Sequence, residues 1–168
     1  MPGLVIADTG PLRYLVLIGH ADVLPRLFGA VSIPATVADK LRQPASPEVA
    51  RTWMANPPSW LATHPDPPEP AADLARLDPG ERAAIALAQA LGAGLLLIDD
   101  RAGVAAARRQ GFRVTGTLGV LADAAREGLL DLAAAFAALQ ATNFYCPPAL
   151  LDALLQEHRR GVRRDGGP

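Results

Sequence analysis

The chain has 168 residues, half of them hydrophobic and a fifth charged, which is enough for one hydrophobic core and too little for two. Its formal net charge of -1 gives no overall attraction to a polyanion, so charge alone does not indicate a nucleic-acid partner. A single cysteine and three scattered histidines exclude an internal disulfide and a structural zinc site, which favours a reducing cytoplasm. The first residues lack a basic leader and no apolar run is long enough for a membrane span, so we expect a cytoplasmic protein without a membrane anchor.

The first third of the chain alternates short apolar runs with helix signals. The run 4–7 lies between a glycine and an aspartate, which is typical of a buried strand in a parallel sheet. Pro11 suits the first turn of a helix, because the N–H that proline lacks is not needed there. The same signals predict a strand at 31–33 and helices at 11–17, 21–28 and 34–41.

A proline-rich segment occupies residues 56–70. Its six prolines exclude a helix or a central strand, because each removes a backbone hydrogen-bond donor. We therefore interpret the segment as a surface loop within the same domain. Trp53 and Trp60 are expected to hold this loop against the body of the protein by burying their rings, with base stacking as the less favoured alternative.

The helix over 79–91 has the clearest signals in the chain. Asp78 is the expected N-cap, Pro79 the first helical residue, and Gly92 follows the last one. A fully apolar strand at 95–98 comes next. The remaining pattern predicts a helix to about residue 110, a strand at 112–114, and helices at 117–127, 132–139 and 149–160.

Strands separated by helices predict an α/β fold, with three α/β/α layers around a central, mainly parallel sheet. We assign this domain to residues 1–145. Residues 146–168 are expected to add a C-terminal helix and a basic tail that pack on the domain or extend it. The arginines of the tail are interpreted as a solvated surface, with contact to a nucleic-acid backbone or a partner protein as the alternative.

Two of the predicted strands, 4–7 and 95–98, run directly into a carboxylate and then into a helix. Asp8 and Asp99 are therefore expected at the carboxyl ends of parallel strands, which is the edge where such sheets bind ligands. The alternative is structural, because Asp8 or Asp100 would also serve as the cap of the helix that follows. Two strands that end in the same way favour a shared acidic site.

Two further acids have structural interpretations when each is considered alone. Glu81 lies three residues after Asp78 and fits a capping box at the helix start. It joins an acidic site only where that helix start faces the strand ends. Asp39, next to Lys40 in the helix over 34–41, fits a solvated surface position.

The order of these motifs resembles that of PIN-domain proteins, and of a bacterial and archaeal subgroup related to VapC-type toxins. Each segment alone is common, whereas the ordered set over residues 4 to 130 is specific. The resemblance rests on Val5 to Leu12, Ile33 to Asp39, Gly80 to Ala88, Leu95 to Arg101 and Val114 to Leu121.

This resemblance implies a metal-dependent nuclease site. The implied catalytic acids are Asp8, Asp39, Glu81 and Asp99. The implied metal ligands are Asp8, Glu81, Asp99 and Asp100, with Thr9 supplying a hydroxyl group behind them. Mg²⁺ or Mn²⁺ is the expected cofactor, because hard oxygen ligands and a substrate phosphate suit these ions. The candidates for contact with the phosphate backbone are Arg101, Arg108 and Arg109, with a solvated helix face as the alternative.

The same resemblance implies a ribonuclease that is the toxin of a toxin–antitoxin pair, with RNA as substrate, a small antitoxin as partner and a homodimer as assembly. The alternative is a PIN-like module that binds RNA or protein and cleaves weakly or not at all. Two departures from the family pattern favour this alternative. Asp39 stands where glutamate is usual, and Ala83 stands where the subgroup often has a second acid.

Three other protein classes with strand-end aspartates or phosphate chemistry fit less well. A phosphoacceptor receiver domain needs an acidic pair after the first strand, where this chain has Asp8 and Thr9. A phosphatase of the haloacid dehalogenase type needs a second aspartate at the position of Gly10. A nucleotide kinase needs a glycine-rich phosphate loop with a lysine, and Lys40 is the only lysine in the chain.

Overall fold

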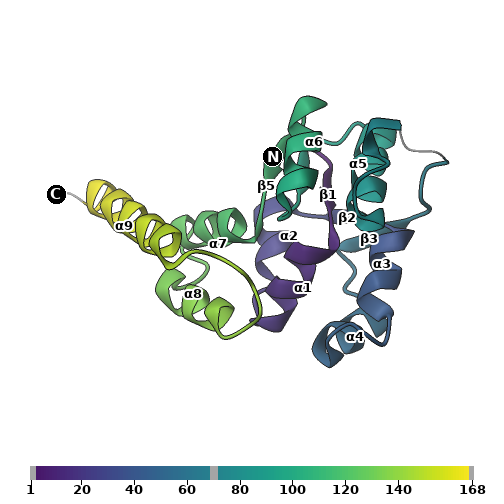
Figure 1. Cartoon of the computed structure of the whole chain (residues 1–168). Helices are drawn as coiled ribbons and strands as arrows, with labels where there is room; N and C mark the ends of the chain where they lie inside the picture. Colours follow the sequence, from purple (N-terminus) through teal and green to yellow (C-terminus); the bar gives the residue numbers. More distant parts are fainter. Residues whose placement is uncertain (1–2, 69–71, 167–168) are drawn as a thin grey trace. The chain divides into compact units, whose positions relative to one another are not determined.

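The computed structural model describes residues 3–68 and 72–166 (Figure 1). Its contacts divide the chain into two compact units, Met1–Thr117 and Leu118–Pro168, and each is described by itself. This division does not test the predicted domain limits, 1–145 and 146–168, which stay a prediction.

The described part of the first unit contains a five-stranded sheet in which every strand pair is parallel. The strands are β1 (Val5–Ala7), β2 (Val31–Pro34), β3 (Leu61–His64), β4 (Leu95–Leu97) and β5 (Arg113–Thr115). The helices are α1 (Thr9–Leu17), α2 (Val23–Phe28), α3 (Ala35–Arg42), α4 (Glu48–Ala55), α5 (Pro79–Leu91) and α6 (Arg101–Arg109), with a short 3-10 helix at Ala72–Leu74. Helices flank the sheet to give three α/β/α layers, which confirms the predicted fold class.

The strand order, β3-β2-β1-β4-β5, places β1 and β4 side by side at the centre of the sheet. From β1 the chain moves outward to β2 and β3, and it then crosses back to the other side of β1 to form β4 and β5. Ala7 of β1 pairs in register with Leu97 of β4. In open parallel sheets, such a reversal of winding direction leaves a ligand-binding crevice at the carboxyl ends of the two strands.

The central strands are short and entirely apolar because helices cover both of their faces. All three residues of β1 are fully buried. Ile6 and Leu96 share one core cluster with Ile85 of α5 and Ala106 of α6. Helix α5 packs against β1, β2 and β4, which fixes its position beside the central pair of strands.

The four predicted strands are confirmed to within one residue at either end, and the proline-rich segment needs a correction. Leu61–His64 is not a loop but the edge strand β3, paired in parallel with all four residues of β2. These four residues contain no proline, and the prolines that flank them are tolerated at a sheet edge. The rings of Trp53 and Trp60 lie 5.9 Å apart at 50° and pack on each other. Residues 69 and 70 of the predicted loop lie outside the described residues.

The described part of the second unit contains α8 (Leu132–Gln140), α9 (Pro148–Asp165) and all of α7 (Thr117–Arg126) except its first residue. Asp131 caps α8 by accepting a 2.9 Å hydrogen bond from the Ala134 N–H. Helix α9 continues to Asp165, five residues beyond the predicted end, because arginine is a good helix former and carries the helix past Gly161. Residues 167 and 168 of the predicted tail lie outside the described part. No helix within 3–68 or 72–166 is both long and apolar enough to span a bilayer.

Candidate active site

Asp8 lies between β1 and α1, at the carboxyl end of a central strand. Its backbone N–H donates to the Leu97 carbonyl oxygen at 2.9 Å, which continues the pairing with β4 by one residue. The side chain is 7% exposed and makes no capping hydrogen bond to α1. Its Oδ1 atom is buried with no partner among the described residues. The capping alternative is therefore not supported, and an unpaired buried carboxylate oxygen indicates a place for a cation or a donor.

Asp99 follows β4, next to Asp8, and both of its oxygens are held by one residue. The Thr117 N–H donates to Oδ1 at 2.7 Å and the Thr117 hydroxyl donates to Oδ2 at 2.6 Å. Gly116 makes this approach feasible, because a Cβ atom there would lie 2.6 Å from Asp99 Oδ1. Gly10 of α1 approaches from another direction, with its Cβ position 3.2 Å from Oδ2. The carboxylate is thus fixed in place while each oxygen keeps a lone pair for a ligand.

The start of α5 faces the same strand ends, which is the condition for Glu81 to join the site. Asp78 caps this helix by accepting a 3.0 Å hydrogen bond from the Gly80 N–H. The Cβ position of Gly80 lies 3.0 Å from Asp8 Oδ1, so the first turn of α5 touches the buried aspartate. Glu81 is 7% exposed, and its Cδ lies 3.3 Å from the Cβ position of Gly103 in α6.

Burial of Asp8 dominates its electrostatics. Loss of hydration raises the pKa of Asp8 from 3.8 to about 6. The Thr9 backbone N–H and the Lys40 ammonium oppose this shift, because both favour the charged form. The negative charges of Asp78 and Asp99 add to it. Asp8 therefore shares its surroundings with other carboxylates and with one ammonium group.

The pKa values of Glu81 and Asp99 are raised as well. Loss of hydration, followed by repulsion from Asp100 and Asp8, raises the pKa of Glu81 from 4.5 to about 7. Burial also raises the pKa of Asp99, against the two hydrogen bonds from Thr117. These mutual repulsions link Asp8, Glu81, Asp99 and Asp100 into one set, which we name the acidic cluster.

Asp100 is the N-cap of α6, as in the structural alternative given for it above. Its Oδ1 accepts a hydrogen bond from the Ala102 N–H at 2.9 Å, and the Gly103 N–H lies 3.5 Å away, so it caps α6. Its charge nevertheless acts on Glu81. Asp100 caps α6 and still belongs to the acidic cluster, because its carboxylate has a second oxygen and spare lone pairs.

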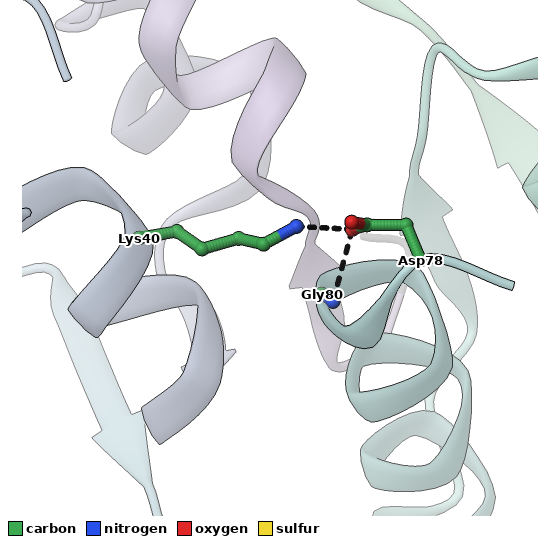
Figure 2. A network of polar contacts seen from close by, with 3 residues as sticks. All are labelled: Lys40, Asp78 and Gly80. Atoms are coloured by element: carbon green, nitrogen blue, oxygen red, sulfur yellow. Dashed lines mark hydrogen bonds and ion pairs between the residues drawn. The ribbon is translucent and has the colours of Figure 1, made fainter. Parts of the chain in front are cut away.

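Helix α3 presents a different residue to the cluster from the one that the sequence suggested. The Asp39 side chain is 78% exposed, with Oδ1 3.8 Å from Nη1 of Arg42 on the same helix. The neighbouring Lys40 reaches across to Asp78 at the start of α5 and pairs with it (Figure 2). The proposed catalytic role of Asp39 stays a prediction. Lys40 and Thr117 are site residues that sequence reasoning missed. The one signal for Lys40 was that it is the only lysine of the sequence.

The remaining predicted residues occupy two settings. Thr9 is 6% exposed, and its hydroxyl is buried with no partner within the described ranges. Arg101 begins α6 and follows Asp100 directly, whereas Arg108 and Arg109 end the same helix, about 10–12 Å farther along its axis. All three arginine side chains are exposed.

The oxygen donors of the acidic cluster fit a hard divalent cation. The unpaired Oδ1 of Asp8 and the raised pKa values of Asp8 and Glu81 both reflect buried negative charge that a cation would neutralise. Within the described residues, no group of three His, Cys, Asp or Glu side chains is placed to hold one ion. Water and a substrate phosphate would therefore complete its coordination, as is usual for Mg²⁺.

Comparison with known protein families agrees with this fold. A family model described as a PIN domain, DUF3368, matches residues 4–160. The match includes every member of the acidic cluster and most of the second unit. No curated protein matches the chain.

Proposed function

The chain belongs to the PIN-domain family, a family with a nuclease-type fold, and from this premise we propose that it is a metal-dependent endoribonuclease. The observation that carries the proposal is the buried, unpaired Oδ1 of Asp8, next to Asp99 at the point where the winding of the sheet reverses. Buried acids with raised pKa values at the carboxyl ends of central strands are typical of a catalytic site.

In this proposal the acidic cluster holds Mg²⁺ or Mn²⁺. When bound, such an ion supplies a water activated for attack on phosphorus and stabilises the leaving oxygen. Asp8 contributes its unpaired oxygen, and Asp99 contributes oxygens that Thr117 holds in a fixed orientation. Glu81 and Asp100 add negative charge that attracts the ion.

Two further assignments belong to the same proposal. Asp39 would act as a fourth catalytic acid only after leaving Arg42 and turning toward α5. Arg101 is the best placed of the three arginines to contact an RNA phosphate beside the cluster, because it follows Asp100. Arg108 and Arg109 would contact phosphates farther along the strand.

We assign the enzyme to the toxin of a toxin–antitoxin pair that acts in the cytoplasm as a homodimer and is restrained by a small antitoxin. The support for this assignment is the similarity of Val114 to Leu121 to the VapC-related subgroup. The nuclease proposal does not depend on it.

A second candidate function is a PIN-like module that binds RNA or a protein and cleaves weakly or not at all. The observation that favours it is the Lys40 ammonium at the edge of the acidic cluster, because a built-in positive charge competes with a metal ion.

Cleavage of mixed RNA substrates with Mg²⁺ or Mn²⁺, by the native protein and by Asp8→Asn, tests the proposal. We expect cleavage by the native protein, its loss in Asp8→Asn, and its loss on chelation of the metal. Equal cleavage by both proteins would remove the nuclease assignment. RNA retention by both proteins without cleavage would establish the binding module instead.

A further inference from the structure

The acidic cluster has a positively charged neighbour that belongs to the chain itself. Lys40 extends from α3 to the start of α5, where its ammonium group pairs with Asp78 (Figure 2). The Lys40 side chain is 25% exposed and that of Asp78 is 45% exposed, so water reaches the pair mainly from the Asp78 side. The pairing also fixes the direction of the lysine side chain.

Gly80 marks the point where Lys40 and the cluster meet. The Cβ position of this glycine lies 3.0 Å from Asp8 Oδ1, 3.2 Å from Asp78 Oδ2 and 3.2 Å from Lys40 Nζ. The ammonium group and the unpaired oxygen of Asp8 therefore border the same small space. A side chain at position 80 would fill that space, which explains why glycine stands there.

The charge of Lys40 acts on both neighbouring aspartates. It lowers the pKa of Asp78 through its hydrogen bond and its charge, and it opposes the upward shift of Asp8. The negative charges of Asp78 and Asp99 act on Asp8 in the opposite direction to Lys40.

We propose that the Lys40 ammonium is a resident cation of the acidic cluster, which stabilises the protein without metal and weakens the binding of a divalent ion at Asp8. A divalent ion bound to Asp8 Oδ1 would meet this fixed positive charge at short range. Lys40 is thus a positioning residue that sets how tightly a cation binds. The stabilising part stands on its own, whereas the effect on a metal rests on the proposed function.

The test uses Lys40→Gln, which removes the charge and keeps a donor for Asp78, and Lys40→Arg, which keeps the charge. Arg42→Gln, on the same helix and paired with Asp39, is the matched control. Mn²⁺ affinity is measured by titration of free Mn²⁺ with electron paramagnetic resonance at pH 7.5. We expect Lys40→Gln to bind Mn²⁺ on the order of tenfold more tightly than the native protein. Lys40→Arg and Arg42→Gln are expected to bind Mn²⁺ with the affinity of the native protein.

A second readout needs no metal. In excess chelator, Lys40→Gln is expected to lower the melting temperature by about 3–6 °C, and by less when Asp8→Asn is also present. A Mn²⁺ affinity within twofold of the native value, or an unchanged melting temperature in chelator, would overturn the proposal. If the native protein neither binds Mn²⁺ nor cleaves RNA, the proposed function fails, and the melting experiment still decides whether Lys40 is a resident cation.

Discussion

The two sides of the acidic cluster are anchored in different ways. On one side, Asp8 and Asp99 follow central strands whose paired backbones leave them little freedom, and each is held by the elements around it. On the other side, α3 supplies a residue from a helix surface. There a step of one residue turns the side chain by about 100°, so Asp39 faces solvent and Lys40 faces the cluster. The end of a strand fixes the position of the acid that follows it. On a helix surface, the direction of a side chain depends on its place in the helical turn.

The strongest test of the strand side is Asp8→Asn. This substitution removes the charge of a carboxylate whose Oδ1 is buried and unpaired among the described residues, so we expect RNA cleavage to fall by about 10²–10⁴-fold. Cleavage of a labelled RNA under single-turnover conditions measures the effect. Asp22→Asn, at an exposed aspartate before α2, is the control and is expected to keep native activity. Loss of less than fivefold in Asp8→Asn would break the assignment of the catalytic centre.

Gly116→Ala tests the hydrogen bonds from Thr117 that hold the Asp99 carboxylate. The new Cβ atom would lie 2.6 Å from Asp99 Oδ1, so the carboxylate must move away from Thr117. We expect cleavage to fall by about 10–100-fold with the protein still folded, as for the loss of a group that orients a ligand. Gly161→Ala is the matched control, because the Cβ position of Gly161 meets no atom within 4 Å beyond its chain neighbours and the nearby backbone of its own helix. Native activity in Gly116→Ala would show that the orientation of Asp99 is unimportant.

The buried carboxylates also predict a dependence of stability on pH in metal-free protein. Asp8 has a pKa of about 6 in the folded protein, against 3.8 for an aspartate in the unfolded chain. Between these pH values the folded state binds more protons than the unfolded state, so stability falls as the pH rises. Glu81 extends the same loss toward pH 7. The Asp8 contribution is about 2–3 kcal/mol over this range.

Asp8→Asn isolates this contribution, because asparagine does not titrate. In chelator, we expect the melting temperature of Asp8→Asn to exceed the native value at pH 7.5 and the difference to shrink toward pH 4.5. Added Mn²⁺ should reverse the order at pH 7.5 by stabilising the native protein alone. A difference in melting temperature that does not change with pH would show that Asp8 carries no destabilising charge at neutral pH.

The same comparison explains what the sequence could and could not predict. The central strands were predictable because uninterrupted apolar runs of four residues between glycine and aspartate fit few other structures. Asp8 and Asp99 followed from those strands. The edge strand β3 was missed because the prolines on either side of it dominate residues 56–70. Helix α4 was missed because few of its positions are buried. Lys40 was missed because contacts between α3 and α5 depend on chain crossings that composition does not encode.

The smallest effect should come from Asp39→Asn. Its carboxylate is 78% exposed and paired at 3.8 Å with Arg42, so its loss removes a weak surface ion pair. We expect cleavage and Mn²⁺ affinity to stay within about threefold of native values, while Lys40→Gln, one residue later, changes Mn²⁺ affinity on the order of tenfold. A loss in Asp39→Asn as large as that of Asp8→Asn would mean that α3 turns or shifts when RNA binds. It would then place Asp39 as the fourth acid, and the two sides of the cluster would be equally fixed during cleavage.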